Sequence, residues 1–182
     1  MIPVGYMAKR VATKPDWLKT SQVEDIYSVS SCISEDFCDY INYWKHNGYW
    51  LFDSPETIKT LAKKNNIALS KTTMFYYEAY ELQSYEDEPI WEEYYPEDSF
   101  STNVVEPKEK TLMGYDVVSF YAGNAPECSY LSCNQMAEKI EVNRHCLLET
   151  LDKAKELINK KAFIGGEPGP CRIFAVFKVE NA

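Results

Sequence analysis

The sequence predicts an α/β protein made of two β-α-β-α-β repeats, related by internal duplication and packed as one pseudo-twofold unit. Residues 50–67, WLFDSPETIKTLAKKNNI, resemble residues 146–163, CLLETLDKAKELINKKAF, which lie 96 positions later. Each segment has a short apolar strand, then an acid and a hydroxyl residue, then an amphipathic helix pattern. Further along, Phe75 aligns with Phe174 at an offset of 99. Similarity at a near-constant spacing indicates a repeated architecture.

Length and composition indicate a globular chain. Its 182 residues, 45% apolar and 26% charged, suffice for one large or two small domains. The expected segments are an N-terminal arm or strand at 1–22, a first repeat at 23–83, an acidic aromatic loop with a polar linker at 84–112, and a second repeat at 113–182.

The first half is expected to alternate strands with two helices. Apolar and β-prone residues predict strands over 1–11, 24–30, 49–52 and 72–82. One helix begins at Ser34, a hydroxyl cap followed by two acids, and ends at Asn47. The other begins at Ser54, has Pro55 at its first position and ends at Asn65.

The second half repeats this order with a weaker first helix. Residues 115–121 predict a strand, and residues 128–139 predict a helix. The strand and helix within residues 146–163 follow the matching segment of the first repeat. A glycine- and proline-rich turn at 165–170 then leads into a last strand at 171–179.

Net charge excludes some partners and suggests another. The formal net charge is −9, yet residues 81–98 hold eight acids and no Lys or Arg, which leaves 20 acids against 19 bases elsewhere. Nucleic-acid binding requires a basic surface, so this class is not expected. No apolar run approaches the ~20 residues of a membrane span, and residues 1–17 lack a secretory apolar core. We therefore expect a cytoplasmic protein with no membrane association.

The six cysteines and two histidines are the residues most suggestive of metal or thiol chemistry. Cys32 and Cys128 share the 96-residue offset, and Cys38 lies near Cys133 in the alignment, as do the two histidines with each other. Zinc prefers such ligands, in one site per repeat or one shared site. However, five and four residues separate the cysteines of each pair. Free cysteine commonly packs as a small apolar side chain. We therefore predict core packing with neither metal nor cofactor, and keep thiol chemistry as an alternative.

Patterns that would indicate catalysis are less specific. A Cys–His nucleophile pair needs the two side chains within hydrogen-bond reach, but His145 and Cys146 are neighbours on an expected strand and point to opposite faces. The acid-rich run places its carboxylates in similar solvated environments, which does not separate their pKa values. The glycine-rich turn precedes a strand, where phosphate cradles precede a helix. These patterns favour binding over catalysis.

The acidic aromatic stretch is the preferred binding site. Rigid aromatic rings supply contact area, and clustered carboxylates attract a cationic partner. We therefore predict a protein-binding module that docks on a basic protein. The residues expected to make contact are Glu86, Asp87, Glu88, Trp91, Glu92, Glu93 and Tyr95.

Two alternatives remain open. One is a small-molecule-binding protein or enzyme with a site between the repeats, built from Tyr115, Cys128, Cys133 and His145. The other is homodimerisation through an exposed strand such as residues 72–82. A solubilising loop is the plainer interpretation of the acidic stretch.

Two segments carry a family resemblance. They are YWKHNGYWLFDSPETIKTLA and GYDVVSFYAGNAPECSYLSCNQMAEKIEVNRHCLLETLDKAKEL. They resemble small acidic bacterial proteins of accessory gene sets, including integron cassettes and toxin–immunity loci. The resemblance implies no activity and no catalytic residue. It does imply that a toxin-like basic protein is a candidate partner, which an immunity protein would block.

Overall fold

The computed structural model describes residues 1–34, 49–85, 90–94, 103–120 and 126–180. Their main element is a five-stranded antiparallel sheet with the order β1-β4-β7-β6, in which β5 pairs with the end of β4. The sheet strands are β1 (Ile2–Lys9), β4 (Thr73–Ser84), β5 (Trp91–Glu93), β6 (Lys110–Ser119) and β7 (Cys171–Val179). A separate two-stranded sheet pairs β2 (Ala12–Thr13) with β3 (Asp25–Ile26).

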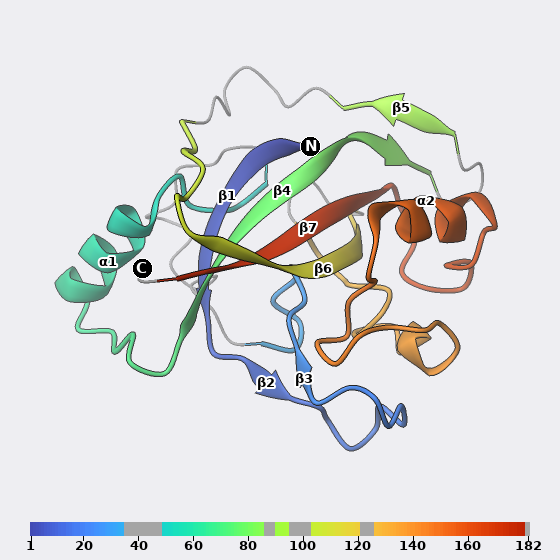
Figure 1. The fold of residues 1–182 in the computed structure, drawn as a ribbon, viewed down its shortest axis with the longest axis horizontal. Coiled ribbons are helices and arrows are strands. Elements are labelled where there is room, and N and C mark those ends of the chain that lie inside the picture. Colours follow the sequence, from blue (N-terminus) through green and yellow to red (C-terminus); the bar gives the residue numbers. More distant parts are fainter. Residues whose placement is uncertain (35–48, 86–89, 95–102, 121–125, 181–182) are drawn as a thin grey trace.

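Two α-helices lie at opposite ends of the large sheet (Figure 1). They are α1 (Pro55–Lys64) and α2 (Leu151–Asn159). Ser54 caps α1 by accepting a 3.2 Å hydrogen bond from the Thr57 amide, and Thr150 caps α2 by accepting a 3.1 Å bond from the Lys153 amide. Both predicted helix starts are therefore confirmed. The part of the chain that the structure describes holds no helix long and apolar enough to cross a bilayer.

The structure confirms a mixed α and β protein but does not confirm the β-α-β-α-β order of each repeat. The strand expected over 24–30 is reduced to the two residues of β3, and that over 49–52 to a bridge between Phe52 and Tyr6. The helix expected over 128–139 is wrong: this segment forms turns and a three-residue 3₁₀ helix, Met136–Glu138. The Ser129 hydroxyl donates to Asp116 of β6, and the Ser132 hydroxyl bonds to that of Ser28; such side-chain bonds compete with helix formation. The helix expected from Ser34 falls on residues 35–48, outside the described ranges.

The two halves nevertheless share unusual local geometry. Trp50 and Cys146, which begin the matched segments, both have positive φ, 57° and 61°. Two residues after each, Phe52 and Leu148 form isolated antiparallel bridges, the first to β1 and the second to β6. A non-glycine residue with positive φ is uncommon, so the coincidence is informative.

The two central strands, β4 and β7, pair so that two equivalent positions, one from each half, lie opposite each other. Tyr77 of β4 lies opposite Val176 of β7, and these residues are separated by the same 99 positions found in the sequence alignment. On the outer strands, Gly5 lies opposite Tyr77 and Gly114 lies opposite Val176, each at a β-bulge. Both glycines have positive φ, 138° and 139°. The backbone is therefore bent at the same place in both strand pairs.

The described residues form two apolar core clusters. One is centred on β1, α1 and β4, and includes Tyr6, Phe52 and Phe75. The other is centred on β6, α2 and the 3₁₀ helix, and includes Leu148 and Ile173. Buried polar residues also occur, and Lys9 at the end of β1 and Asp116 in β6 are both no more than 1% exposed. These two charged side chains hold the loops 28–32 and 127–133.

Candidate functional site

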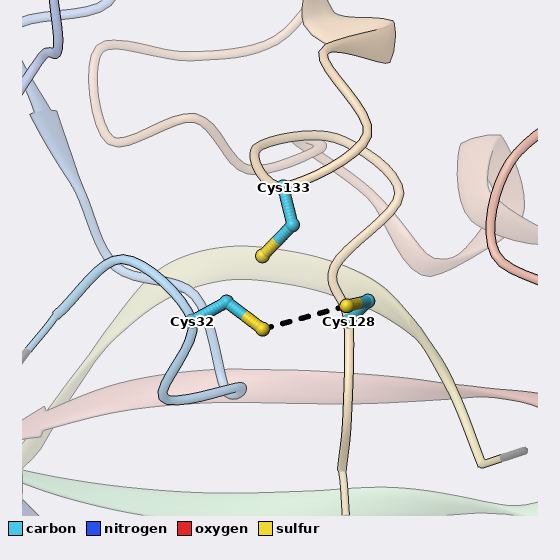
Figure 2. Close-up of side chains that lie close together, drawn as sticks. All are labelled: Cys32, Cys128 and Cys133. Atoms are coloured by element: carbon cyan, nitrogen blue, oxygen red, sulfur yellow. Dashed lines mark hydrogen bonds between the residues drawn. The ribbon is translucent and has the colours of Figure 1, made fainter.

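Three cysteines from two distant loops converge beside β6. Cys32 ends the loop 28–32, while Cys128 and Cys133 belong to the loop 127–133. The Sγ atoms of Cys32 and Cys128 are 3.4 Å apart, and all three Sγ atoms lie within 4.8 Å of one another. Figure 2 shows the Cys133 sulfur directed toward the other two. We call Cys32, Cys128 and Cys133 the thiol cluster.

Serine side chains join the two loops around the thiol cluster. Ser30 Oγ lies 3.4 Å from Cys133 Sγ and accepts a 3.3 Å hydrogen bond from the Ser129 amide. The hydroxyls of Ser28 and Ser132 are hydrogen-bonded to each other across the same junction. All four serines are buried. Because buried hydroxyls need partners, these bonds fix the relative position of the loops.

Lys9 anchors the loop 28–32 through its ammonium group. Its ammonium group donates hydrogen bonds of 2.9, 2.6 and 2.9 Å to the carbonyl oxygens of Ser28, Val29 and Ser30. The side chain is 1% exposed. A buried ammonium group is costly unless its donors are used, and three carbonyl acceptors meet this requirement. The loop backbone is thus folded around a charge at the end of β1.

Asp116 anchors both loops from β6. Its carboxylate accepts hydrogen bonds from the Val29 amide at 2.9 Å, the Ser129 hydroxyl at 2.7 Å and the Val117 amide at 2.9 Å. Burial raises the pKa of the Asp116 carboxyl to about 6, while these bonds and the charge of Lys9 act in the opposite direction. One carboxylate therefore connects the residues that precede Cys32 with those that follow Cys128.

The three thiols have different environments. Cys32 is exposed, and its Sγ contacts the Glu127 carbonyl oxygen at 2.9 Å. A hydrogen bond with Cys133 lowers the pKa of Cys32 and raises that of Cys133. Burial raises the pKa of Cys128. The cluster thus combines one solvent-facing thiol with two half-buried ones.

The expected core packing of cysteine is correct for some positions and wrong for the thiol cluster. Cys146 and Cys171 are buried in the second apolar cluster. In contrast, the clustered cysteines are exposed or half-buried, because their loops lie at the edge of the sheet and contact each other through polar side chains. Cys38 and His46, which the sequence aligned with Cys133 and His145, lie outside the described residues.

The four residues predicted to line one pocket do not all lie together. Cys128 and Cys133 come together, but His145 Nδ1 pairs with Asp25 Oδ1 at 2.6 Å, and its ring stacks on Tyr27 at a centroid distance of 4.2 Å. Tyr115 lies opposite Ala175 within the sheet. A cavity of about 560 Å³ lies between residues 19–22 and 137–141 and is lined by none of the four.

The predicted docking stretch is described in part. Trp91 is half-buried and meets the Tyr80 ring edge-on at 5.5 Å, so this ring supports the sheet. Glu92 and Glu93 are exposed on β5, at the periphery of the sheet (Figure 1). The remaining predicted contact residues, which lie outside the described ranges, are Glu86, Asp87, Glu88 and Tyr95.

A neighbouring tyrosine, Tyr94, also faces inward. The guanidinium carbon of Arg172 lies 3.2 Å from the centroid of the Tyr94 ring and 4.0 Å from that of Phe120. Arg172 is 2% exposed, and its Nη2 donates a 3.3 Å hydrogen bond to Gln83. An arginine between two aromatic rings fixes the end of β5 against β7.

The sequence patterns did not identify Lys9, Asp116 or the four serines. Two signals were present in the sequence. A lysine stands at the end of one apolar strand and an aspartate inside another, and both loops carry serine beside cysteine, in SVSSC and CSYLSC. A charge in an apolar strand indicates a buried polar contact. In this protein both charges bind the loops that carry the thiol cluster.

Comparisons of the chain with protein-family models, with curated proteins and with solved structures found no match. The function is therefore inferred from the geometry of the site.

Proposed function

We propose that the protein binds a zinc ion through the thiolates of Cys32, Cys128 and Cys133. The observation that carries the proposal is the convergence of three Sγ atoms, all within 4.8 Å of one another, from loops 96 residues apart. In a tetrahedral zinc site each Zn–S bond is about 2.3 Å, which places neighbouring sulfurs roughly 3.8 Å apart. Small side-chain rotations are enough to reach that spacing.

The ligand set selects the kind of metal. Thiolates favour soft and borderline ions such as Zn²⁺ over Mg²⁺ or Ca²⁺. Three protein ligands leave one tetrahedral position, and Cys32 is exposed. We infer that a water molecule takes the fourth position, as in open zinc sites.

The surroundings of the cluster support metal binding. Ser30 lies within hydrogen-bond distance of Cys133 Sγ, at 3.4 Å, so its hydroxyl can donate to a metal-bound thiolate. Lys9 and Asp116 hold the backbone of the two loops. Ligands held in place before the ion arrives lose less conformational freedom when it binds.

We also infer that the two halves descend from one duplicated unit, consisting of a strand, a bridged segment, a helix and a strand. Support comes from the symmetric pairing of Tyr77 with Val176 and from the matched positive φ values at Trp50 and Cys146. Under a pseudo-twofold relation, equivalent residues near the axis approach each other. Cys32 and Cys128 share the offset of Trp50 and Cys146, so a shared site at the junction follows from the duplication.

The metal proposal is tested by measuring bound metal in protein purified under reducing conditions. We expect about one zinc ion per chain by elemental analysis, and thiolate-to-metal charge-transfer absorption after replacement with Co²⁺. Cys32→Ser, Cys128→Ser and Cys133→Ser should each lower the affinity, whereas Cys171→Ala, in the apolar core, should not. Reduced protein that takes up no Zn²⁺ would refute the proposal, as would wild-type affinity in the three serine variants.

A second candidate function is docking of a basic protein at β5. The specific observation is that exposed apolar and acidic side chains occur together there: Tyr85 is 41% and Ile90 is 55% exposed, beside the exposed Glu92 and Glu93. Apolar contacts stabilise such a complex, and carboxylates orient and accelerate association. The immunity-type role suggested by the resemblance belongs to this second candidate.

The docking proposal is tested by charge reversal. A captured basic partner should bind less tightly in 0.5 M salt, roughly tenfold or more. The double variant Glu92→Lys with Glu93→Lys should abolish capture. The control variant Glu141→Lys changes an exposed acid elsewhere and should leave capture unchanged. Equal capture by both variants would contradict docking at β5.

A further inference from the structure

We propose that the thiol cluster is also an oxidation site, in which peroxide joins Cys32 and Cys128 in a disulfide. The disulfide itself follows from the geometry of the thiols. Its consequence, release of zinc on oxidation, rests on the proposed metal function.

The positions of the two sulfurs favour this pair. Cys32 Sγ and Cys128 Sγ are 3.4 Å apart, and a disulfide bond is about 2.05 Å long. Both cysteines lie outside strands and helices, so the sulfurs can approach without breaking the main sheet. The contact of Cys32 Sγ with the Glu127 carbonyl holds its side chain beside the residue that precedes Cys128.

Access and order of reaction also follow from burial. Cys32 is exposed, whereas Cys128 and Cys133 are half-buried. An oxidant from solvent therefore reaches Cys32 first. Cys128 is then the second thiol, because its Sγ lies 3.4 Å from that of Cys32, whereas the Cys133 Sγ is also in contact with the Ser30 hydroxyl at 3.4 Å.

The chemistry is a two-electron oxidation by hydrogen peroxide. The Cys32 sulfur attacks one peroxide oxygen and the O–O bond breaks, which gives a sulfenic acid at Cys32; the departing hydroxide takes the Cys32 proton and becomes water. The Cys128 sulfur then attacks the Cys32 sulfur and displaces hydroxide, which takes the Cys128 proton as a second water. Two thiols and one peroxide thus give one disulfide and two water molecules.

The disulfide and the metal exclude each other. A disulfide sulfur is no longer a thiolate, so oxidation removes two of the three proposed ligands and leaves Cys133 alone. A dithiol reductant would restore the thiols and the metal site. The cluster would then convert peroxide exposure into metal release, and the disulfide would tie the loop 28–32 to the loop 127–133.

The experiment maps disulfides in metal-free wild-type protein after treatment with equimolar hydrogen peroxide and alkylation. We expect one intramolecular link between the peptides that contain Cys32 and Cys128. In Cys128→Ser the link should be lost and Cys32 should be trapped as a sulfenic acid by dimedone. The matched variant Cys133→Ser should still form the link.

Several outcomes overturn the proposal. A link between Cys32 and Cys133, a link between two chains, or no link at all in reduced metal-free protein each contradicts it. Because the mapping uses the unsubstituted chain, misfolding of a variant does not affect its result. A second arm adds peroxide to zinc-loaded protein and follows release with a chromogenic chelator. If the protein binds no zinc but forms the expected link, the metal proposal alone fails.

Discussion

The Ser129 hydroxyl donates a 2.7 Å hydrogen bond to Asp116, so a fully buried carboxylate holds the residue next to Cys128. This contact makes the thiol cluster depend on the protonation and the side-chain chemistry of a residue in the middle of β6. A pH series and five substitutions, one of them an exposed control, test that dependence and the contributions of other positions.

Asp116 should make stability fall with rising pH in a defined window. Burial raises its pKa to about 6 in the folded protein, while the ordinary value is near 3.8. The folded state therefore binds an extra proton between these values. This contribution is fully present below about pH 4 and is lost as the pH rises through about 6. Among the described residues, the Lys9 ammonium and the Cys146 thiol interact electrostatically with this carboxyl.

The measurement compares wild type with Asp116→Asn by denaturant unfolding from pH 4 to pH 7. The variant loses a hydrogen bond, which lowers its stability by an amount that does not vary with pH. As the pH rises from 4 to 7, the wild type should lose on the order of 2–3 kcal/mol of unfolding free energy relative to the variant. A difference that stays constant with pH would show that Asp116 is already ionised at pH 4.

Lys9→Met should destabilise the protein strongly. The substitution keeps an unbranched side chain but removes the ammonium that binds the carbonyl oxygens of Ser28, Val29 and Ser30. Buried acceptors that lose their donor cost about 1–3 kcal/mol each, so we expect a loss of about 3 kcal/mol or more. Thermal unfolding would show this. Zinc affinity of the folded fraction should also fall, because the loop that carries Cys32 loses its anchor.

Arg172→Met should be much better tolerated, although Arg172 is also a buried cation. Its Nε and Nη1 atoms have no hydrogen-bond partner in the structure's described part, and its guanidinium contacts the rings of Tyr94 and Phe120. Burial lowers its pKa. Methionine keeps the apolar contacts and removes the unpaired donors, so we expect a loss of no more than about 1 kcal/mol. A loss equal to that of Lys9→Met would contradict this account.

Gly114→Ala should be severely destabilising. An added Cβ would lie 2.8 Å from both Leu147 Cβ and the Leu148 carbonyl oxygen, at a φ of +139°. Strain and overpacking together should cost about 3 kcal/mol or more. The matched variant Gly165→Ala also has positive φ, +89°, but meets nothing within 4 Å. It should cost only about 1 kcal/mol in chemical denaturation, which separates backbone strain from the close approach of β6 to Leu147.

Helices α1 and α2 were predictable because their signals are local. Ser54 with Pro55, and Thr150 after an acid, are start signals that act over three residues, and both caps form as expected. The aromatic strand over residues 72–82 was predictable for the same reason and corresponds to β4. The strand expected over 115–121 extends further toward the N-terminus in β6, because the linker's last residues pair with the end of β7.

The site was harder to predict because its contacts are non-local. The repeat aligned Cys32 with Cys128, but alignment within a chain does not say whether equivalent residues meet. Their meeting depends on the antiparallel pairing of β4 with β7 and on the Lys9 and Asp116 anchors. Residues 128–139 were expected to be helical, which would have separated Cys128 from Cys133 along one helix. Instead, Ser132 bonds to Ser28 of the other loop and the Ser129 hydroxyl donates to Asp116 of β6. Hydrophobic periodicity carries no signal of these competing bonds.

The separation of 96 residues between Cys32 and Cys128 has a consequence for biosynthesis. During translation the first loop emerges with its thiol long before β6 and the second loop exist. A contact so distant in sequence forms only after most of the sheet has assembled. A nascent chain therefore has no thiol cluster, and the proposed metal binding and the proposed internal disulfide require that the ribosome has delivered the second half.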